Sequence, residues 1–209
     1  MNVKLTDSND RTRNGTQWGP GVMHKAPGRG NLCTDGWIHY YRDPMLAVLM
    51  DPAHGKFGEN AHMWTVTTSG KRKHEPDKSG AQRVRTVERI EMPTVTLVQR
   101  QAFGILAARE VYAQWSTRDT DGKWWLWSER WLSGEDRSTA EASRAARAAA
   151  RATAARAATA ATAATASRVA WEWAAWAARE SAEANPKINL VEIAHKAMNK
   201  ITEEKDENL

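Results

Sequence analysis

The stretch AQRVRTVERIEMPTVTLVQRQAFGILAAREVYAQW, residues 81–115, changes its hydrophobic period at Pro93. Before the proline, Val84 and Ile90 alternate with arginines and glutamates, which is typical of a half-exposed β-strand. After it, apolar residues recur every three or four positions, which is typical of a helix. The sequence therefore predicts an α+β protein, in which a small N-terminal mixed β domain precedes an all-helical, alanine-rich C-terminal region.

The helix after Pro93 has a recognisable start. Thr96 is followed three residues later by Gln99, which is the spacing of a capping box. One face of this helix should carry Val98, Ala102, Ile105, Arg109 and Tyr112. We expect helices from here to the end, and we divide the chain into a β-containing domain at 1–95, a Trp-rich helical connector at 96–134 and an alanine-rich region at 135–209.

Two later segments of the C-terminal half also have helical patterns. Trp124, Trp127 and Trp131 recur at helical spacing and are predicted to be core residues. A short amphipathic helix is predicted to begin at Asn189, because Glu192 follows it three residues later.

Upstream of Pro93, short apolar pieces alternate with turn formers, as in β-hairpins. GWIHYY at 36–41 and HMWTVTTSG at 62–70 predict strands, the second ending at Gly70. The charged run KRKHEPDKSG at 71–80 predicts a mobile loop.

A short helix is predicted between these two strands. Asp43 can cap its N-terminus, with Pro44 as its first residue. We expect it to end before Pro52, because proline disrupts a helix interior.

Composition suggests a soluble, cytoplasmic protein. The chain has 209 residues, a formal net charge of +5 and a pI near 9.5, a basic balance that attracts nucleic acid only weakly. The single cysteine, Cys33, excludes an intrachain disulfide and fits a reducing compartment. The N-terminus lacks the apolar core of a signal peptide, and no apolar run is typical of a membrane span.

The alanine segment at 138–184 predicts a helix that, if continuous, would extend for roughly 70 Å. Arginines and threonines recur there every three residues, so on a helix the polar stripe winds around the axis. Small residues on all sides permit close contact with other helices, from this chain or from a second copy, and homo-oligomerisation is expected. Bulky residues that could form the packing or oligomer interface are Val169, Trp171, Trp173 and Trp176. An alternative, phosphate binding, would use Arg144, Arg147, Arg151 and Arg156.

The residue pattern gives little support for a metal site or for a nucleophilic catalytic site. Cys33 and His39 lie six residues apart, but no zinc-binding motif accompanies them, so neither a metal nor a cofactor is predicted. Cys33 is expected to be a small buried residue and His39 a hydrogen-bonded strand residue. A nucleophilic set of Cys33, His39 and Asp35 would need an electropositive niche that the sequence does not show.

Several short motifs resemble one group of proteins. They are Gln17-Trp18-Gly19, the run from Leu32 to His39, Pro44 with Leu46–Leu49, Trp64, the run from Ile90 to Pro93, and Trp131–Gly134 followed by Asp136-Arg137. With the alanine-rich tail, these motifs resemble a group of phage and bacterial proteins. The resemblance implies a phage or prophage accessory protein in the host cytoplasm, and it carries no known active site.

Three functions remain open. The first is a non-enzymatic phage protein that binds a host or phage protein, for host takeover or counter-defence, and oligomerises through its alanine-rich helices. The second is a nucleotide- or nucleic-acid-binding protein that uses Trp18, His24, Arg29, Trp37, His39 and Tyr41. The third is an enzyme of the ADP-ribosyl-transfer type, by analogy with folds that place a His and a Tyr on core strands.

Overall fold

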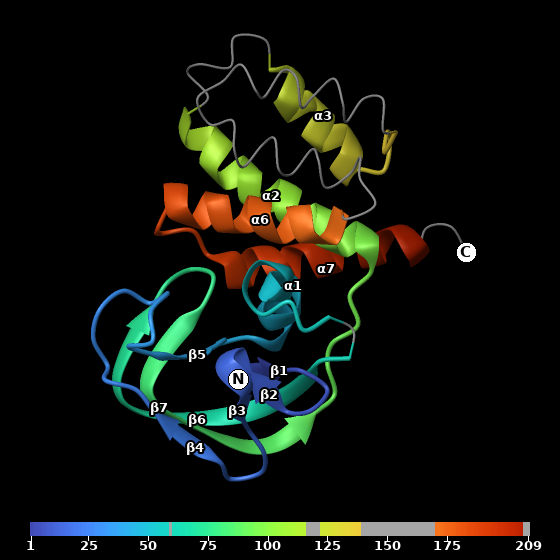
Figure 1. The fold of residues 1–209 in the computed structure, drawn as a ribbon. Helices are drawn as coiled ribbons and strands as arrows, with labels where there is room; N and C mark the ends of the chain where they lie inside the picture. Colours follow the sequence, from blue (N-terminus) through green and yellow to red (C-terminus); the bar gives the residue numbers. More distant parts are fainter. Residues whose placement is uncertain (59, 116–121, 139–169, 207–209) are drawn as a thin grey trace. The chain divides into compact units, whose positions relative to one another are not determined.

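The computed structural model is a mixed α+β structure, and it describes residues 1–58, 60–115, 122–138 and 170–206. The chain divides into two compact units, Met1–Thr94 and Val95–Leu209. The strands lie in the first unit, together with one α-helix, and the second unit is helical where it is described (Figure 1).

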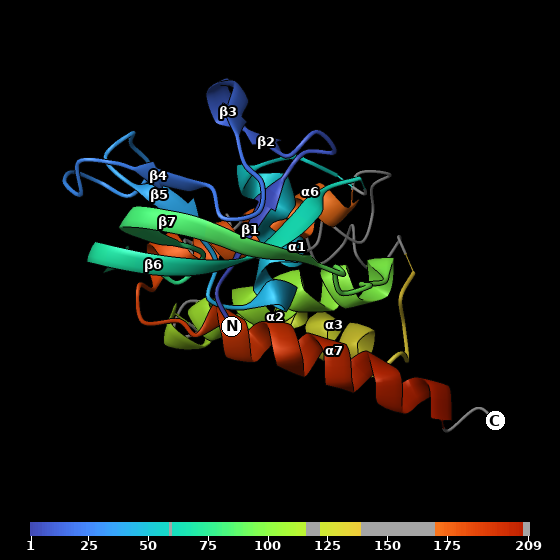
Figure 2. The same cartoon turned by 90° about the horizontal axis from the view of Figure 1, so that it is seen from below.

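The first unit is built on a five-stranded antiparallel sheet. Its strands are β1 (Val3–Thr6), β4 (Met23–Lys25), β5 (Ile38–Tyr40), β6 (His62–His74) and β7 (Ser79–Ile90). The order is β1-β6-β7-β4, and β5 also pairs with β7. A separate two-stranded hairpin, β2 (Arg11–Thr12) with β3 (Thr16–Gln17), stands away from this sheet in Figure 2, and the 3-10 turn η1 (Arg13–Gly15) joins its strands.

The long β6–β7 hairpin corrects the prediction of a strand that ends at Gly70. β6 continues to His74, which pairs with Ser79 at the start of β7, so only residues 75–78 of the predicted loop lie outside the strands. The register shifts between Ser69 and Arg72, and Gly70 lies there with a φ of +77°. Glycine adopts positive φ without steric cost, so here it forms a bulge and the strand continues. Lys71, Arg72 and Lys73 are therefore held on β6, and Lys78 lies in the turn.

One face of the sheet forms the core of the first unit. Trp18, Tyr40, Val66, Ala81 and Val84 are buried together, and Ile38 packs against them. Val66 and Val84 come from neighbouring strands of the hairpin, β6 and β7. The opposite face of the hairpin consequently carries the polar residues.

Helix α1 (Pro44–His54) begins as predicted but ends later. The Asp43 carboxylate accepts a hydrogen bond from the Leu46 amide, which confirms the cap. Pro52 lies inside the helix, so the predicted end before it is wrong. Asp51 holds the chain beyond this point, because its carboxylate accepts hydrogen bonds from the amides of Phe57 and Gly58.

Four helices form the described part of the second unit: α2 (Leu97–Trp115), α3 (Lys123–Leu132), α6 (Ala170–Ala184) and α7 (Leu190–Asp206). The capping box of α2 is confirmed, because Thr96 and Gln99 exchange hydrogen bonds between side chain and backbone. The predicted start of α7 is also confirmed, since the Glu192 amide donates to the Asn189 side chain.

Close helix contact and buried aromatic rings hold this unit together. Trp124, Trp127 and Trp131 are buried, as predicted. α2 contacts α6, and a Cβ on Gly104 would lie only 2.9 Å from the Cα of Ala174. Within the described part of the chain, no helix combines the length and apolar character needed to cross a membrane.

Candidate functional site

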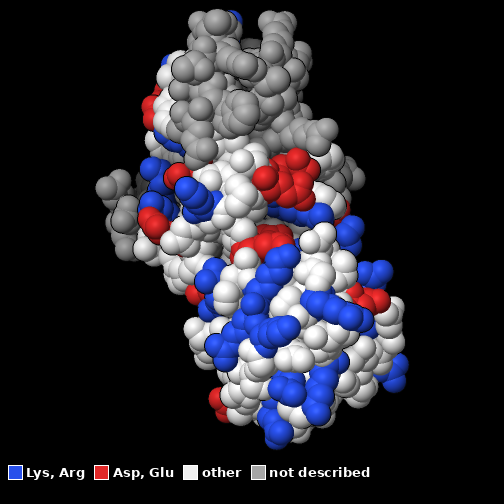
Figure 3. Space-filling model, turned by 90° about the vertical axis from the view of Figure 1, so that its left-hand side faces the viewer, with Lys and Arg blue, Asp and Glu red and all other residues white. Residues whose placement is uncertain are grey.

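Positive charge is concentrated in the first unit. Residues 1–94 contain 14 Lys and Arg against 10 Asp and Glu, whereas residues 95–209 contain 16 against 15. Figure 3 shows one side of the molecule, on which Lys and Arg clearly outnumber Asp and Glu over the lower part. The excess of positive charge therefore lies in the unit that contains the sheet.

The strand register brings basic residues together on the outer face of β4, β7 and β6. Arg83 of β7 lies between Lys25 of β4 and Ser69 of β6. Arg85 lies two residues further along β7, with Thr67 of β6 opposite it. Residues directly opposite, or two apart on one strand, share a face of a sheet. We call this set of Lys25, Thr67, Ser69, Arg83 and Arg85 the basic sheet face.

The burial pattern confirms which face these residues occupy. Lys25, Thr67, Ser69 and Arg85 are exposed and Arg83 is half-buried. Val84 lies between the two arginines in sequence and is fully buried. The core beneath the sheet therefore fixes the backbone from which the two guanidinium groups project.

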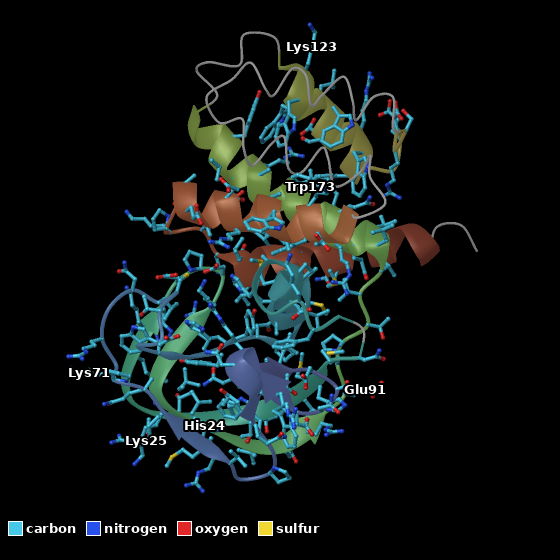
Figure 4. The ribbon with its side chains drawn as sticks, viewed as in Figure 1. His24, Lys25, Lys71, Glu91, Lys123 and Trp173 are labelled. Atoms are coloured by element: carbon cyan, nitrogen blue, oxygen red, sulfur yellow. The ribbon has the colours of Figure 1, made fainter. Side chains whose placement is uncertain are left out.

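The charged groups and hydroxyls of the basic sheet face have no partner among the described residues. Among the described residues, Lys25, Arg83 and Arg85 have no ion-pair partner, and the hydroxyls of Thr67 and Ser69 make no hydrogen bond within the chain. Lys71, at the bulge of β6, is exposed as well. In Figure 4, Lys25 and Lys71 project outward on the side of the molecule that Figure 3 presents.

The structure buries part of the residue set that the sequence suggested for ligand binding. Trp18 is buried, and the ring of His24 meets it edge-on with centroids 4.5 Å apart. His24 Nε2 lies 2.8 Å from the Gln17 carbonyl oxygen. In Figure 4, His24 points inward whereas its neighbour Lys25 points outward. Trp18 therefore belongs to the core, and the half-buried His24 packs against it.

The other residues of that set lie in different surroundings. Trp37 is buried, and its indole N–H donates to the Gly30 carbonyl. Arg29 is exposed in the neighbouring loop. His39 is a hydrogen-bonded strand residue, as predicted, because its ring contacts the Leu32 carbonyl. Burial, followed by the charges of Lys4 and Lys78, lowers the pKa of His39, although its bond to Leu32 opposes this shift.

Tyr41 belongs to a buried chain of hydrogen bonds that sequence reasoning did not identify. Its hydroxyl lies 2.9 Å from His54 Nδ1, and His54 Nε2 lies 2.9 Å from a carboxylate oxygen of Asp77. Burial, together with the charges of Asp51 and Asp77, raises the pKa of Tyr41 well above its usual value. The phenol is therefore neutral, and the chain ties the end of α1 to the β6–β7 turn.

A second polar cluster holds the loop after β1 against the sheet. One oxygen of Asp10 lies 2.8 Å from His62 Nδ1 and 3.1 Å from the indole nitrogen of Trp64. Its other oxygen accepts from Arg89 at 2.7 Å. Burial would raise the pKa of Asp10, but these partners lower it. Since Arg89 is paired in this way, it is not counted in the basic sheet face.

Cys33 is exposed, so its prediction as a buried residue is wrong. It lies between Leu32 and Thr34 in an irregular segment that has no strand to bury it. Among the described residues, no group of three or more His, Cys, Asp or Glu side chains is arranged to hold a metal ion.

The residues suggested in the alanine segment are described only in part. Arg144, Arg147, Arg151, Arg156 and Val169 lie outside the described residues, as does the side chain of Trp171. Trp173 is 42% exposed on α6, and the ring of Trp176 lies 5.1 Å from the guanidinium of Arg179. The alanines between and beside them, Ala174, Ala175, Ala177 and Ala178, are buried.

The signal for the basic sheet face was present in the sequence. Arg83 and Arg85 alternate with Val84, which is the spacing that places two charges on one face of a strand. What the sequence could not supply was the pairing of Arg83 with Lys25 and Ser69, which are far apart along the chain. Comparison of the chain with family models, curated proteins and solved structures found no match in any of the three.

Proposed function

We propose that the protein is a non-enzymatic binding protein whose first unit binds the phosphate backbone of nucleic acid on the basic sheet face. The observation that carries this proposal is the grouping of Lys25, Arg83 and Arg85, which have no acidic partner among the described residues. An unpaired cluster of this kind is the usual electrostatic footprint of a nucleic-acid-binding surface.

The composition of the basic sheet face supports phosphate as the group it binds. Arg, Lys, Ser and Thr side chains are among the groups that commonly contact phosphate oxygens in nucleic-acid complexes. Each arginine has a hydroxyl directly across the strand, Arg83 with Ser69 and Arg85 with Thr67. A phosphate between each pair could accept from a guanidinium and a hydroxyl together.

Binding by the basic sheet face should depend little on base sequence. No aromatic ring is among the exposed large apolar side chains of the described part of the first unit, which are Met1, Met23 and Val87. Contacts to phosphate position a nucleic acid but carry no sequence information. We therefore expect similar affinities for oligonucleotides of different sequence.

The test is fluorescence anisotropy of labelled oligonucleotides with the full chain over a range of salt concentrations. Three phosphate contacts predict that log K falls with log salt at a slope of roughly −2 to −3. The variant Arg83→Gln/Arg85→Gln should weaken binding at least about tenfold and flatten this slope. Arg13→Gln, an exposed arginine on η1, is the matched control. Unchanged affinity in the double variant would refute the proposal.

Binding of a protein partner is a second candidate, which the exposure of Trp173 favours. A tryptophan that is 42% exposed, on a helix whose alanines are buried, is a feature of protein interfaces. This candidate includes self-association through the alanine-rich helices and, from the resemblance to phage proteins, a role in host takeover or counter-defence. Trp173→Gln should then lower the mass measured by light scattering or abolish capture of the partner. A variant with unchanged mass and unchanged capture would exclude this site.

A further inference from the structure

We infer that the ligand of the basic sheet face is a single-stranded nucleic acid, DNA or RNA, in preference to a duplex. This inference rests on the proposed function and adds the class of ligand. Two observations on the described residues carry it: the width of the strand assembly that presents the charges, and the apolar side chains that lie among them.

The basic sheet face is too wide to enter a duplex groove. Its residues come from three adjacent strands, because β4, with Lys25, and β6, with the hydroxyls of Thr67 and Ser69, pair with opposite edges of β7. Three strands place the outer two backbones about 10 Å apart before any side chain is added. The major groove of B-DNA is about 12 Å wide and admits a helix or a two-stranded ribbon.

The end of the β6–β7 hairpin is also unable to act as a projecting ribbon. Its turn is fixed by Asp77, which contacts His54 at the end of α1. The adjoining Lys78 is buried, with its amine 3.6 Å from the same carboxylate. A duplex could therefore contact only the outer surface of the sheet, where few of its phosphates would reach the cations.

Apolar side chains lie beside the arginines on the same face. Met23 of β4 is 39% exposed and pairs with Arg85. Val87 is 47% exposed and follows Arg85 by two residues on β7. A surface that alternates cations with exposed apolar groups fits a ligand that presents phosphates and bare base faces together. Single strands expose their bases in this way, whereas a duplex keeps them stacked inside.

The geometry thus assigns two roles on one surface. Lys25, Arg83 and Arg85 would hold successive phosphates, while Met23 and Val87 would contact the faces or sugars of the unstacked bases. The arginines lie two residues apart on one strand, at a spacing of about 7 Å. A flexible single strand can adjust its backbone to this spacing, because it has no second strand to keep in register.

The experiment compares four labelled ligands with the full chain at one salt concentration: a 20-nucleotide oligo-dT, an oligo-U of equal length, a DNA duplex and an RNA duplex of the same length. Binding to one or both single strands should be about tenfold or more tighter than binding to the matching duplex. Oligo-dT and oligo-U then distinguish DNA from RNA as the preferred ligand.

Two variants separate the inference from the proposed function. Met23→Gln/Val87→Thr keeps side-chain shape and every charge, and should lose severalfold affinity for single strands with no change for duplexes. Arg83→Gln/Arg85→Gln should weaken both. Thermal melting of each variant verifies that the fold is intact, and the single variant Val87→Thr replaces the pair if the pair does not fold.

The outcomes distinguish two failures. Equal or tighter binding of duplexes, or an unchanged single-strand preference in the Met23 and Val87 variants, overturns the inference and leaves the proposed function standing. Absence of binding to all four ligands overturns the proposed function as well.

Discussion

At the scale of the residue, Lys4 is an ionisable group whose pKa is set by burial. Burial lowers the pKa of Lys4 from its usual 10.5 to about 8. Its amine nevertheless donates to the His39 carbonyl at 2.9 Å and lies 4.5 Å from the centre of the Trp18 ring. These two contacts keep the amine in place while the protonated form is disfavoured, so folding releases a proton from Lys4 at pH values between the folded and unfolded pKa.

This shift predicts that the protein becomes more stable as the pH rises above 8. The unfolded chain keeps the Lys4 proton up to about pH 10.5, whereas the folded chain loses it near 8, so the penalty present below pH 8 disappears as pH increases. The free energy of unfolding should increase by about 2 kcal/mol between pH 7.5 and 9.5. Lys4→Met should remove this increase, as measured by urea unfolding at both pH values. An equal increase in the variant would contradict the assignment.

Asp77 gives a dependence of the same sign in the acid range, where the free energy of unfolding also increases with pH. Burial would raise the pKa of Asp77, but the hydrogen bond and charge of His54, with the charge of Lys78, lower it to about 2. A carboxylate of lowered pKa stabilises the fold above its unfolded pKa, and this contribution is lost as the pH falls toward 2. Asp77→Asn should cost about 2 kcal/mol at pH 7, with the difference from wild type vanishing near pH 2. The exposed Asp35→Asn is the control. If it lowered the free energy of unfolding as much as Asp77→Asn, the stabilising role given to the Asp77–His54 hydrogen bond would be wrong.

At the scale of the element, local signals predicted the helix starts, while long-range pairing decided the strands. The caps at Asp43, Thr96 and Asn189 involve residues three apart, so the sequence contains the whole interaction. The continuation of β6 past Gly70 depends on pairing with β7, which no local pattern encodes. The same limitation hid the basic sheet face, because its members come from three strands.

The α2–α6 contact makes a prediction at this scale. Alanine normally stabilises a helix over glycine by about 1 kcal/mol. At Gly104 the added Cβ would lie 2.9 Å from the Cα and 3.1 Å from the carbonyl oxygen of Ala174, and a backbone cannot yield as a flexible side chain can. Gly104→Ala should therefore destabilise the second unit by about 1–3 kcal/mol. Gly19→Ala, whose Cβ would meet Val22 at an ordinary 3.7 Å, should change stability little in the same thermal melts.

At the scale of the whole molecule, the net charge of +5 is divided unequally between the two units. The average suggested only weak attraction to nucleic acid, but nearly all of the excess lies in residues 1–94. Folding concentrates it further, because residues separated by up to 60 positions, such as Lys25 and Arg85, meet on one face. Local concentration of charge, more than the total, sets the affinity for phosphate.

This division predicts that residues 1–94 carry the nucleic-acid binding by themselves. They form a compact unit with its own sheet and core, and every member of the basic sheet face lies within them. A fragment of these residues should melt cooperatively and bind oligo-dT within about threefold of the full chain, with the same salt slope, because each phosphate contact contributes equally to that slope. The complementary fragment, 95–209, should not bind oligo-dT. A folded 1–94 fragment with a shallower slope would mean that cations of the second unit also contact the phosphates.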